Sequence, residues 1–319
     1  MTPQPADLLA QADPDVLDRL TAIGEFSINA GNLAAMRSQP IRTPETLTDA
    51  VERRDYCVPG PAGAPDVAVR VHRPRNASAA LPGVVSMHGG GYVVGTHLSD
   101  DGRFDAWSPR FGCVGVSVGY RLAPETPFPG PLEDCCAALR WVREQGSDIG
   151  VDPARIGVMG GSAGGGLAAG LTLLARDRAE VPIDFQLLTY PMIDDRQITP
   201  SSRRDVPLWG PATNRFGWQS YLGSRYGSDD ISPYAAAARA TDLAGLPPAF
   251  VMVGSLDGFL DEDIDYARRL LAAGVPTELY VIAGAPHGFD SMMPGTRVAR
   301  RARQALETWL DAYLHPSTP

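Results

Sequence analysis

From residue 83 onward the chain alternates short apolar segments with helical patterns, and this alternation restricts the folds it can adopt. The apolar segments have the length of buried strands and cover residues 83–87, 113–118, 155–159, 185–189, 249–253 and 277–282. Helical patterns at 131–144, 163–178, 261–273 and 297–314 separate most of them. Strands that alternate with helices build a parallel sheet covered on both faces. We therefore predict an α/β fold with a mostly parallel central sheet, to which the valine-rich residues 67–71 add an edge strand.

Two segments do not fit the alternation. Residues 1–50 contain helical patterns at 13–20 and 30–37 and carry no strand signal. Residues 195–230 also lack a strand pattern and interrupt the βα units. We expect both segments to form a helical cap over a core built from residues 51–194 and 231–319. For 195–230 the alternative is an irregular surface excursion.

The segment Gly160-Gly161-Ser162-Ala163-Gly164 fits the pattern G-x-S-x-G. It lies between a predicted strand and an Ala/Leu-rich helical pattern, which is the setting of a nucleophile elbow. Glycines on both sides of the serine allow the sharp turn that such an elbow needs. The context therefore favours Ser162 as a nucleophile over a plain glycine-rich turn.

Three further features follow predicted strands. A glycine triplet begins after His88, where free N–H groups can approach a substrate and stabilise an oxyanion. Asp257 and His287 come later, so the chain order is Ser, Asp, His, as in α/β-hydrolases. Because parallel strands carry their sites at the carboxyl edge, these residues are expected to meet there. Asp261 and Asp263 compete with Asp257, but they fall inside a helical pattern.

Composition excludes several other classes of protein. The formal net charge of −9 and the absence of a basic run argue against a nucleic-acid partner. No segment reaches the ~20 apolar residues of a membrane span. The N-terminus lacks the pattern of a secretion signal, so a cytoplasmic location is expected. The cysteines have no metal-ligand spacing, and we expect neither a metal nor a cofactor.

Taken together, these motifs resemble the hormone-sensitive-lipase family of α/β-hydrolases, the bacterial family IV esterases. The segments that carry the resemblance are 88–92, 120–125, 160–165, Asp257 with Asp261-Glu262, and 287–289. The resemblance implies that Ser162 is the nucleophile, His287 the base and Asp257 the acid. It also implies oxyanion donors at the N–H groups of Gly90, Gly91 and Ala163, and structural support from residues 120–125. One departure is Gly161, where the family commonly carries Asp or Thr.

The expected activity is hydrolysis of small esters with short- to medium-chain acyl groups. Bulky side chains are expected to line a closed substrate pocket, and besides Phe26 they are Tyr92, Trp209, Phe216 and Trp218. Two alternatives remain open at this point: an amidase or peptidase on the same fold, and a binding protein that has lost catalysis. A homodimer is compatible with the sequence, which does not decide the oligomeric state.

Overall fold

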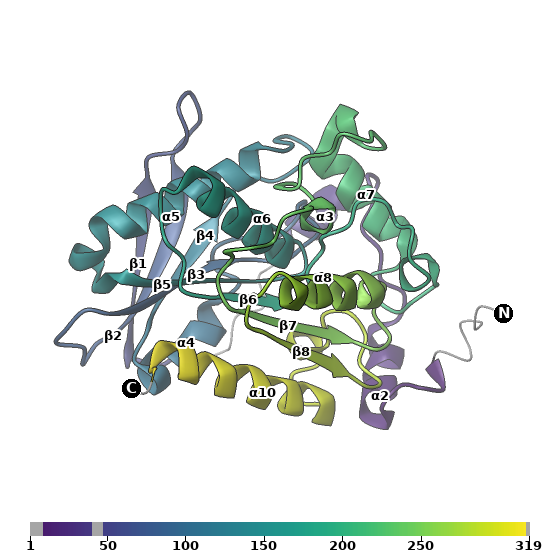
Figure 1. Ribbon diagram of the computed structural model, residues 1–319. Coiled ribbons are helices and arrows are strands. Elements are labelled where there is room, and N and C mark those ends of the chain that lie inside the picture. The colour runs from purple at the N-terminus through teal and green to yellow at the C-terminus, as the bar shows by residue number, and fades with distance from the viewer. Residues whose placement is uncertain (1–8, 40–46, 317–319) are drawn as a thin grey trace.

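A computed structural model describes residues 9–39 and 47–316 of the chain. An eight-stranded sheet with the order β1-β2-β4-β3-β5-β6-β7-β8 runs through it (Figure 1). The strands are β1 (Val51–Val58), β2 (Val67–Pro74), β3 (Leu81–Met87), β4 (Val114–Gly119), β5 (Val151–Gly161), β6 (Gln186–Thr189), β7 (Ala249–Gly254) and β8 (Thr277–Ile282). From β4 to β8 all neighbours are parallel, whereas β1 and β2 join antiparallel. The prediction of a mostly parallel sheet is confirmed.

Both edges of the sheet differ from expectation. The predicted edge strand, β2, is an inner strand, because β1 pairs along its whole length. β1 escaped prediction because its interior is charged and exposed, and only Val51 and Val58 at its ends are buried. At the other edge β8 has the predicted bounds, but only Ile282 is buried in it.

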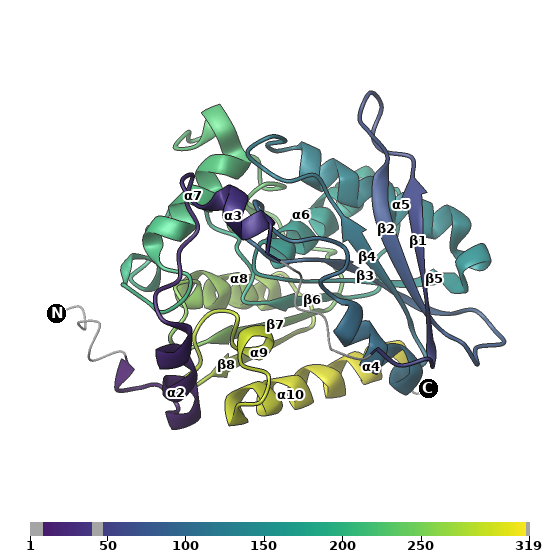
Figure 2. The ribbon, with the colours of Figure 1, turned by 180° about the vertical axis from the view of Figure 1, so that it is seen from behind.

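Helices cover both faces of the sheet. α5 (Gly130–Ile149), α6 (Ala163–Arg178) and α8 (Leu260–Ala272) pack on one face, and α4 (Asp101–Phe111) and α10 (Arg297–Leu314) pack on the other (Figures 1 and 2). α6 and α10 have the predicted bounds. α5 continues five residues beyond the predicted end, to where Gly150 takes a left-handed conformation. α4 was not predicted, because Gly102 and Pro109 weaken its helical pattern.

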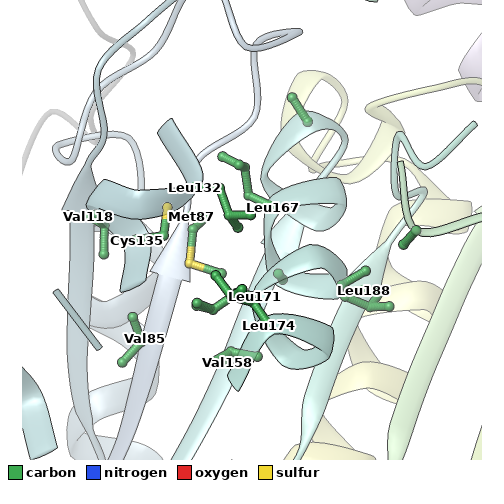
Figure 3. Packing of buried hydrophobic residues seen from close by; sticks show 14 of the residues in the cluster. Val85, Met87, Val118, Leu132, Cys135, Val158, Leu167, Leu171, Leu174 and Leu188 are labelled. Carbon is green, nitrogen blue, oxygen red and sulfur yellow. The ribbon is translucent and has the colours of Figure 1, made fainter. Parts of the chain in front are cut away.

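The core under α5 and α6 explains why these two helices lie where they do. Val85, Met87 and Val158 of the sheet belong to one buried cluster with Leu167 and Leu171 of α6 (Figure 3). α6 is buried along most of its length, and every residue from Ala163 to Ala175 is buried. At about 25 cal/mol per Å² of buried apolar surface, such a helix is held by burial rather than by its own propensity. Its N-terminus is therefore fixed against the carboxyl edge of the sheet.

Four further α-helices of the described residues are not among these five: α2 (Pro14–Ile23), α3 (Leu33–Arg37), α7 (Pro211–Leu222) and the short α9 (Phe289–Met292). Asp13 precedes α2, as predicted, but its carboxylate forms an ion pair with Arg297 of α10 instead of capping α2. α3 is shorter than the predicted helix over 30–37. Within the predicted N-terminal cap segment, residues 1–8 and 40–46 lie outside the described residues. The predicted absence of a strand in 195–230 is confirmed.

Arg37 at the end of α3 ties this helix to two loops of the core. Its guanidinium donates to the carbonyl oxygens of Val93 and Ala123, at 2.8 and 2.7 Å. It also donates to both carboxylate oxygens of Glu125, and these hydrogen bonds lower the pKa of Glu125 to about 2. α3 is thus held by one side chain to the segments that follow β3 and β4.

Candidate active site

Ser162 stands at the sharp turn between β5 and α6. Its backbone angles are φ 57° and ψ −124°, a conformation that a non-glycine residue adopts only under strain. The Ser162 carbonyl oxygen accepts hydrogen bonds from the N–H groups of Gly166 and Met192. The N–H of Ser162 donates to the carbonyl oxygen of Thr189. These bonds hold the turn in place and leave the hydroxyl free to project from it.

Gly164 lets this turn sit directly against the end of β3. A β-carbon at this position would collide with the carbonyl oxygen of Met87. Since only glycine has no β-carbon, the residue two places after Ser162 must be glycine for α6 to approach β3 this closely. The flanking glycine of the motif therefore serves packing between helix and strand.

The structure brings Ser162, His287 and Asp257 together in one chain of hydrogen bonds. His287 Nε2 lies 2.9 Å from Ser162 Oγ, and His287 Nδ1 lies 2.8 Å from Asp257 Oδ2. All three residues are buried, with 7%, 6% and 1% of their surface exposed in the order Ser162, His287, Asp257. The arrangement is that of a nucleophile, a base and a carboxylate that orients the base.

Aromatic rings enclose the imidazole of His287. The ring centroids of Tyr190, Phe259 and Trp209 lie 4.8, 5.0 and 5.8 Å from that of His287. Such surroundings restrict ring rotation and keep bulk water away from the bond to Asp257. Low polarity around the pair strengthens the electrostatic part of that bond.

The N–H groups of Gly90, Gly91 and Ala163 are available to a ligand. Within the described residues, no hydrogen bond engages the N–H of Gly90 or Gly91. Ala163 is the first residue of α6, where the N–H groups have no partner inside the helix and the helix dipole is positive. Gly91 has φ +59°, and a β-carbon there would collide with the ring of Trp209. The loop after β3 thus depends on glycine at this point.

A cavity of about 310 Å³, called here the catalytic cavity, opens over Ser162 and His287. Its walls include Gly89, Gly90, Gly161 and Trp209. Of the five side chains expected in a substrate pocket, the structure brings Phe26 and Trp209 to this cavity. Apolar residues that were not expected there also line it, and they are Ile28, Met36, Met87, Val94, Leu208 and Met292.

The prediction is wrong for the other three residues, which do not line the catalytic cavity. Tyr92 is fully buried in the core, where it stacks on Tyr221 at 3.9 Å and donates to the Met192 carbonyl. Trp218 is also fully buried and lies 5.5 Å from the Tyr92 ring. Phe216 packs against the same core from α7. These large side chains suggested a pocket wall, but they fill the space between α7 and the segment after β3.

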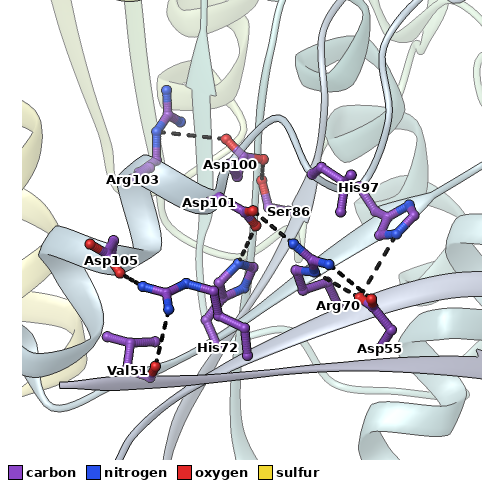
Figure 4. Close-up of polar contacts among 12 residues, drawn as sticks. Val51, Asp55, Arg70, His72, Ser86, His97, Asp100, Asp101, Arg103 and Asp105 are labelled. Atoms are coloured by element: carbon purple, nitrogen blue, oxygen red, sulfur yellow. Dashed lines mark hydrogen bonds and ion pairs between the residues drawn. The ribbon is translucent and has the colours of Figure 1, made fainter. Parts of the chain in front are cut away.

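Polar residues form one part of the catalytic cavity and were missed from the sequence. Tyr190, Asp100 and Arg103 line it. Asp100 accepts a hydrogen bond from Ser86 Oγ at 2.6 Å and forms an ion pair with Arg103 at 3.8 Å (Figure 4). Tyr190 directly follows β6, so the rule that located Asp257 at a strand end could have found it. Asp100 and Arg103 lie at the start of the unpredicted α4.

His88 supports the glycine loop from behind. Its ring stacks on Tyr120 at a centroid distance of 4.1 Å, and its Nδ1 lies 2.8 Å from the carbonyl of Gly89. The Tyr120 hydroxyl donates to the carbonyl of His88. Burial lowers the pKa of His88 to about 4.

The acidic residues of α8 have structural positions. Asp261 accepts from the N–H of Ser201, and Glu262 accepts from the N–H groups of Ile193 and Asp194. Asp263 is fully buried, and neither of its carboxylate oxygens has a hydrogen-bond partner among the residues that the structure describes. Within the described residues, no cluster of His, Cys, Asp and Glu side chains could hold a metal ion. No helix in residues 9–39 and 47–316 is long and apolar enough to cross a membrane.

Comparisons with known proteins find relatives among esterases. A family model described as alpha/beta hydrolase fold matches residues 84–291. Esterase LipI of Mycobacterium tuberculosis is 36% identical over 290 residues, which is 89% of each chain. Ethyl acetate hydrolase of Pseudomonas putida is 34% identical and covers 70% of this chain and 71% of its own. A solved structure titled Bacterial Heroin Esterase superposes with a TM-score of 0.89 at 37% identity, covering 96% of this chain and 99% of its own.

Proposed function

Since this chain belongs to the α/β-hydrolase fold family, and within it to the hormone-sensitive-lipase family of carboxylic ester hydrolases, we propose that it hydrolyses small esters through Ser162, His287 and Asp257. The preferred substrates in this proposal carry short- to medium-chain acyl groups. The observation that carries the proposal is the continuous chain of hydrogen bonds from Ser162 Oγ through His287 to Asp257.

In the first half of the reaction, Ser162 Oγ attacks the ester carbonyl carbon while His287 Nε2 accepts the serine proton. Asp257 holds the ring with Nε2 toward Ser162 and stabilises the positive charge that the ring acquires. The carbonyl oxygen becomes an oxyanion, which receives hydrogen bonds from Gly90, Gly91 and Ala163. Removing one such donor typically costs on the order of 3 kcal/mol of barrier.

In the second half, His287 gives its proton to the leaving alcohol, and the carbon–oxygen bond of the ester breaks. The acyl group stays on Ser162 as an ester. Water then attacks this acyl-enzyme with His287 again as the base, and the carboxylic acid leaves as Ser162 regains its proton. No step draws on a group from outside the chain except the ester and water.

The size of the catalytic cavity is consistent with small substrates. A volume of about 310 Å³ is at the lower end of ligand pockets, which hold ~300 to 1,000 Å³. One part of it is lined by Phe26, Ile28, Met36, Leu208 and Trp209. In the proposal these parts of residues 1–50 and 195–230 act as the cap over the site.

Substitution of Ser162 by alanine tests the proposal. Turnover of p-nitrophenyl butyrate should fall by roughly 10⁶-fold, as expected when a serine nucleophile is removed. Ser232→Ala is the matched control, because this serine accepts from the Tyr234 N–H and does not line the catalytic cavity. Comparable turnover in both variants would refute the assignment. A matched p-nitroanilide that is cleaved faster than the ester would instead indicate an amidase.

A further inference from the structure

Two cavities meet at Phe26 and Leu208. One is the catalytic cavity. The other, called here the second cavity, measures about 500 Å³ and is lined by Leu9, Leu17, Leu20 and Val206, among others. Phe26 and Leu208 line both cavities, so the two spaces share these two residues.

The apolar part of the second cavity suits a hydrocarbon. Leu9 and Leu17 leave 37% and 39% of their surface exposed, although large apolar residues are usually buried. The charged residues in this lining, Glu25 and Asp205, are both acidic. An anionic ligand would be repelled by this pair, whereas an uncharged chain could cover the leucines.

The backbone at Leu208 is held in a strained turn. Leu208 has φ +68°, and the Trp209 N–H donates to the carbonyl of Pro207 at 2.9 Å. This hydrogen bond closes a γ-turn of the rare kind with positive φ. Such strain persists only where the surroundings enforce it, and it is concentrated at functional sites. Here the turn places Leu208 in the lining of both cavities and Trp209 beside His287.

Phe26 is the other residue that the two cavities share. It lies in the segment between α2 and α3 and packs against both hydrophobic clusters of the core. Phe26 therefore borders both the space over Ser162 and the space beside Leu17 and Leu20 of α2. We expect that removal of the ring joins the two cavities.

We propose that Phe26 and Leu208 form the wall that limits chain length, and that the second cavity behind this wall is the space that receives the far end of a hydrocarbon chain once the wall is removed. This inference rests on the proposed ester hydrolysis and adds its specificity determinant. With the wall in place, kcat/KM rises with chain length until the chain meets Phe26 and Leu208, and then falls. Where the wall is removed, each methylene that enters the second cavity gains up to about fourfold.

The test measures kcat/KM for two series of esters. One runs from p-nitrophenyl acetate to the palmitate, and the other from ethyl acetate to dodecyl acetate, so that a chain on either side of the ester is detected. In Phe26→Ala the ratio of dodecyl-chain to butyl-chain substrates should rise at least about tenfold in one series. Leu208→Gly should have the same effect and suits the positive φ, which covers the case that Phe26→Ala folds poorly.

A charge in the second cavity then tests where the chain goes. Adding Leu17→Asp to Phe26→Ala should return the ratio to within about threefold of the wild type, because a carboxylate opposes burial of a hydrocarbon. Adding Leu271→Asp is the control, since Leu271 is 54% exposed and lines neither cavity. The Leu271→Asp substitution should leave the raised dodecyl-to-butyl ratio of Phe26→Ala unchanged.

The outcomes separate the two proposals. Normal turnover of short esters with an unchanged ratio in both Phe26→Ala and Leu208→Gly would overturn the wall. If the raised dodecyl-to-butyl ratio of Phe26→Ala persists when Leu17→Asp is added, the chain does not enter the second cavity and that part of the proposal is wrong. Absence of turnover for every ester in the wild type would overturn the proposed function, and the role of the second cavity with it.

Discussion

Asp257 and Phe259 are joined by a hydrogen bond of 3.0 Å from the Phe259 N–H to Oδ1 of the carboxylate. This bond leaves Oδ2 to face Nδ1 of His287 at 2.8 Å. The orientation of the imidazole thus depends on a backbone group two residues further along the chain. Because Asp257 is 1% exposed, water does not compete for either oxygen.

Asp257→Asn should fold normally and lose most of its activity. An asparagine can still accept from the Phe259 N–H through its oxygen, and its NH₂ group then faces Nδ1 of His287. Two donors cannot share that contact, so the ring is driven to the tautomer that cannot accept the Ser162 proton. We expect kcat to fall by about 10⁴-fold. Asp265→Asn, at an exposed position paired with Arg268, is the control. A loss below tenfold in Asp257→Asn would contradict this role.

Activity should decrease toward acidic pH in a single step. His287 accepts the Ser162 proton only while its ring is neutral, so protonation stops the reaction. His88 also lines the catalytic cavity, but burial lowers its pKa to about 4, so it stays neutral from about pH 5 upward. A kcat/KM profile from about pH 5 to 9 should therefore fit one ionisation on the acidic side. A flat profile would argue against a histidine base.

Gly161→Asp should be tolerated at a moderate cost in stability. Gly161 is not in the left-handed region, so another residue can adopt its backbone conformation. A β-carbon there would lie 2.9 Å from Thr189 Oγ1, which must then shift. Such crowding typically costs about 1 to 3 kcal/mol in the free energy of unfolding. Thr189→Ala removes Oγ1, and the double variant should recover most of that loss in thermal unfolding. If the double variant recovers none of the lost stability, the contact with Thr189 Oγ1 is not its cause.

Asp263→Asn should stabilise the protein increasingly as pH rises. Burial, with Glu262 and Asp257 nearby, raises the pKa of Asp263 well above its ordinary value. The folded state therefore binds this proton more tightly than the unfolded state. The resulting stability is complete below an unfolded pKa of about 3.9 and is lost as pH rises toward the folded pKa.

The difference between Asp263→Asn and the wild type isolates this group from the other carboxylates. It should grow from near zero at about pH 4 to at least about 1 kcal/mol at neutral pH, because an unpartnered buried polar group costs about 1 to 3 kcal/mol. Urea unfolding at several pH values measures it. Asp265→Asn should show no comparable trend. A difference that shrinks with rising pH would mean that Asp263 has a partner in solution.

The residues at the carboxyl ends of strands were predictable because each follows an apolar run in a fixed order. Ser162, Asp257 and His287 could be found in this way without knowledge of any distance. The pocket could not, because an aromatic residue fits a core and a cavity wall equally well by size. Tyr92 and Trp218 lie in the core, whereas the turn at Leu208 places Trp209 in the lining of the catalytic cavity. That turn has no signature in the sequence, since leucine rarely adopts a positive φ.

The four hydrogen bonds of Arg37 also bear on how the molecule opens locally. Arg37 holds the carbonyls of Val93 and Ala123, one of which lies two residues after Gly91. Unwinding of α3 would therefore release the segment that carries the Gly90 and Gly91 N–H groups, and loosening of that segment would release α3. Native-state hydrogen exchange should report both as one cooperative unit with a common opening free energy. Local unfolding of α3 and the segment after β3 would then inactivate the site before the sheet itself unfolds.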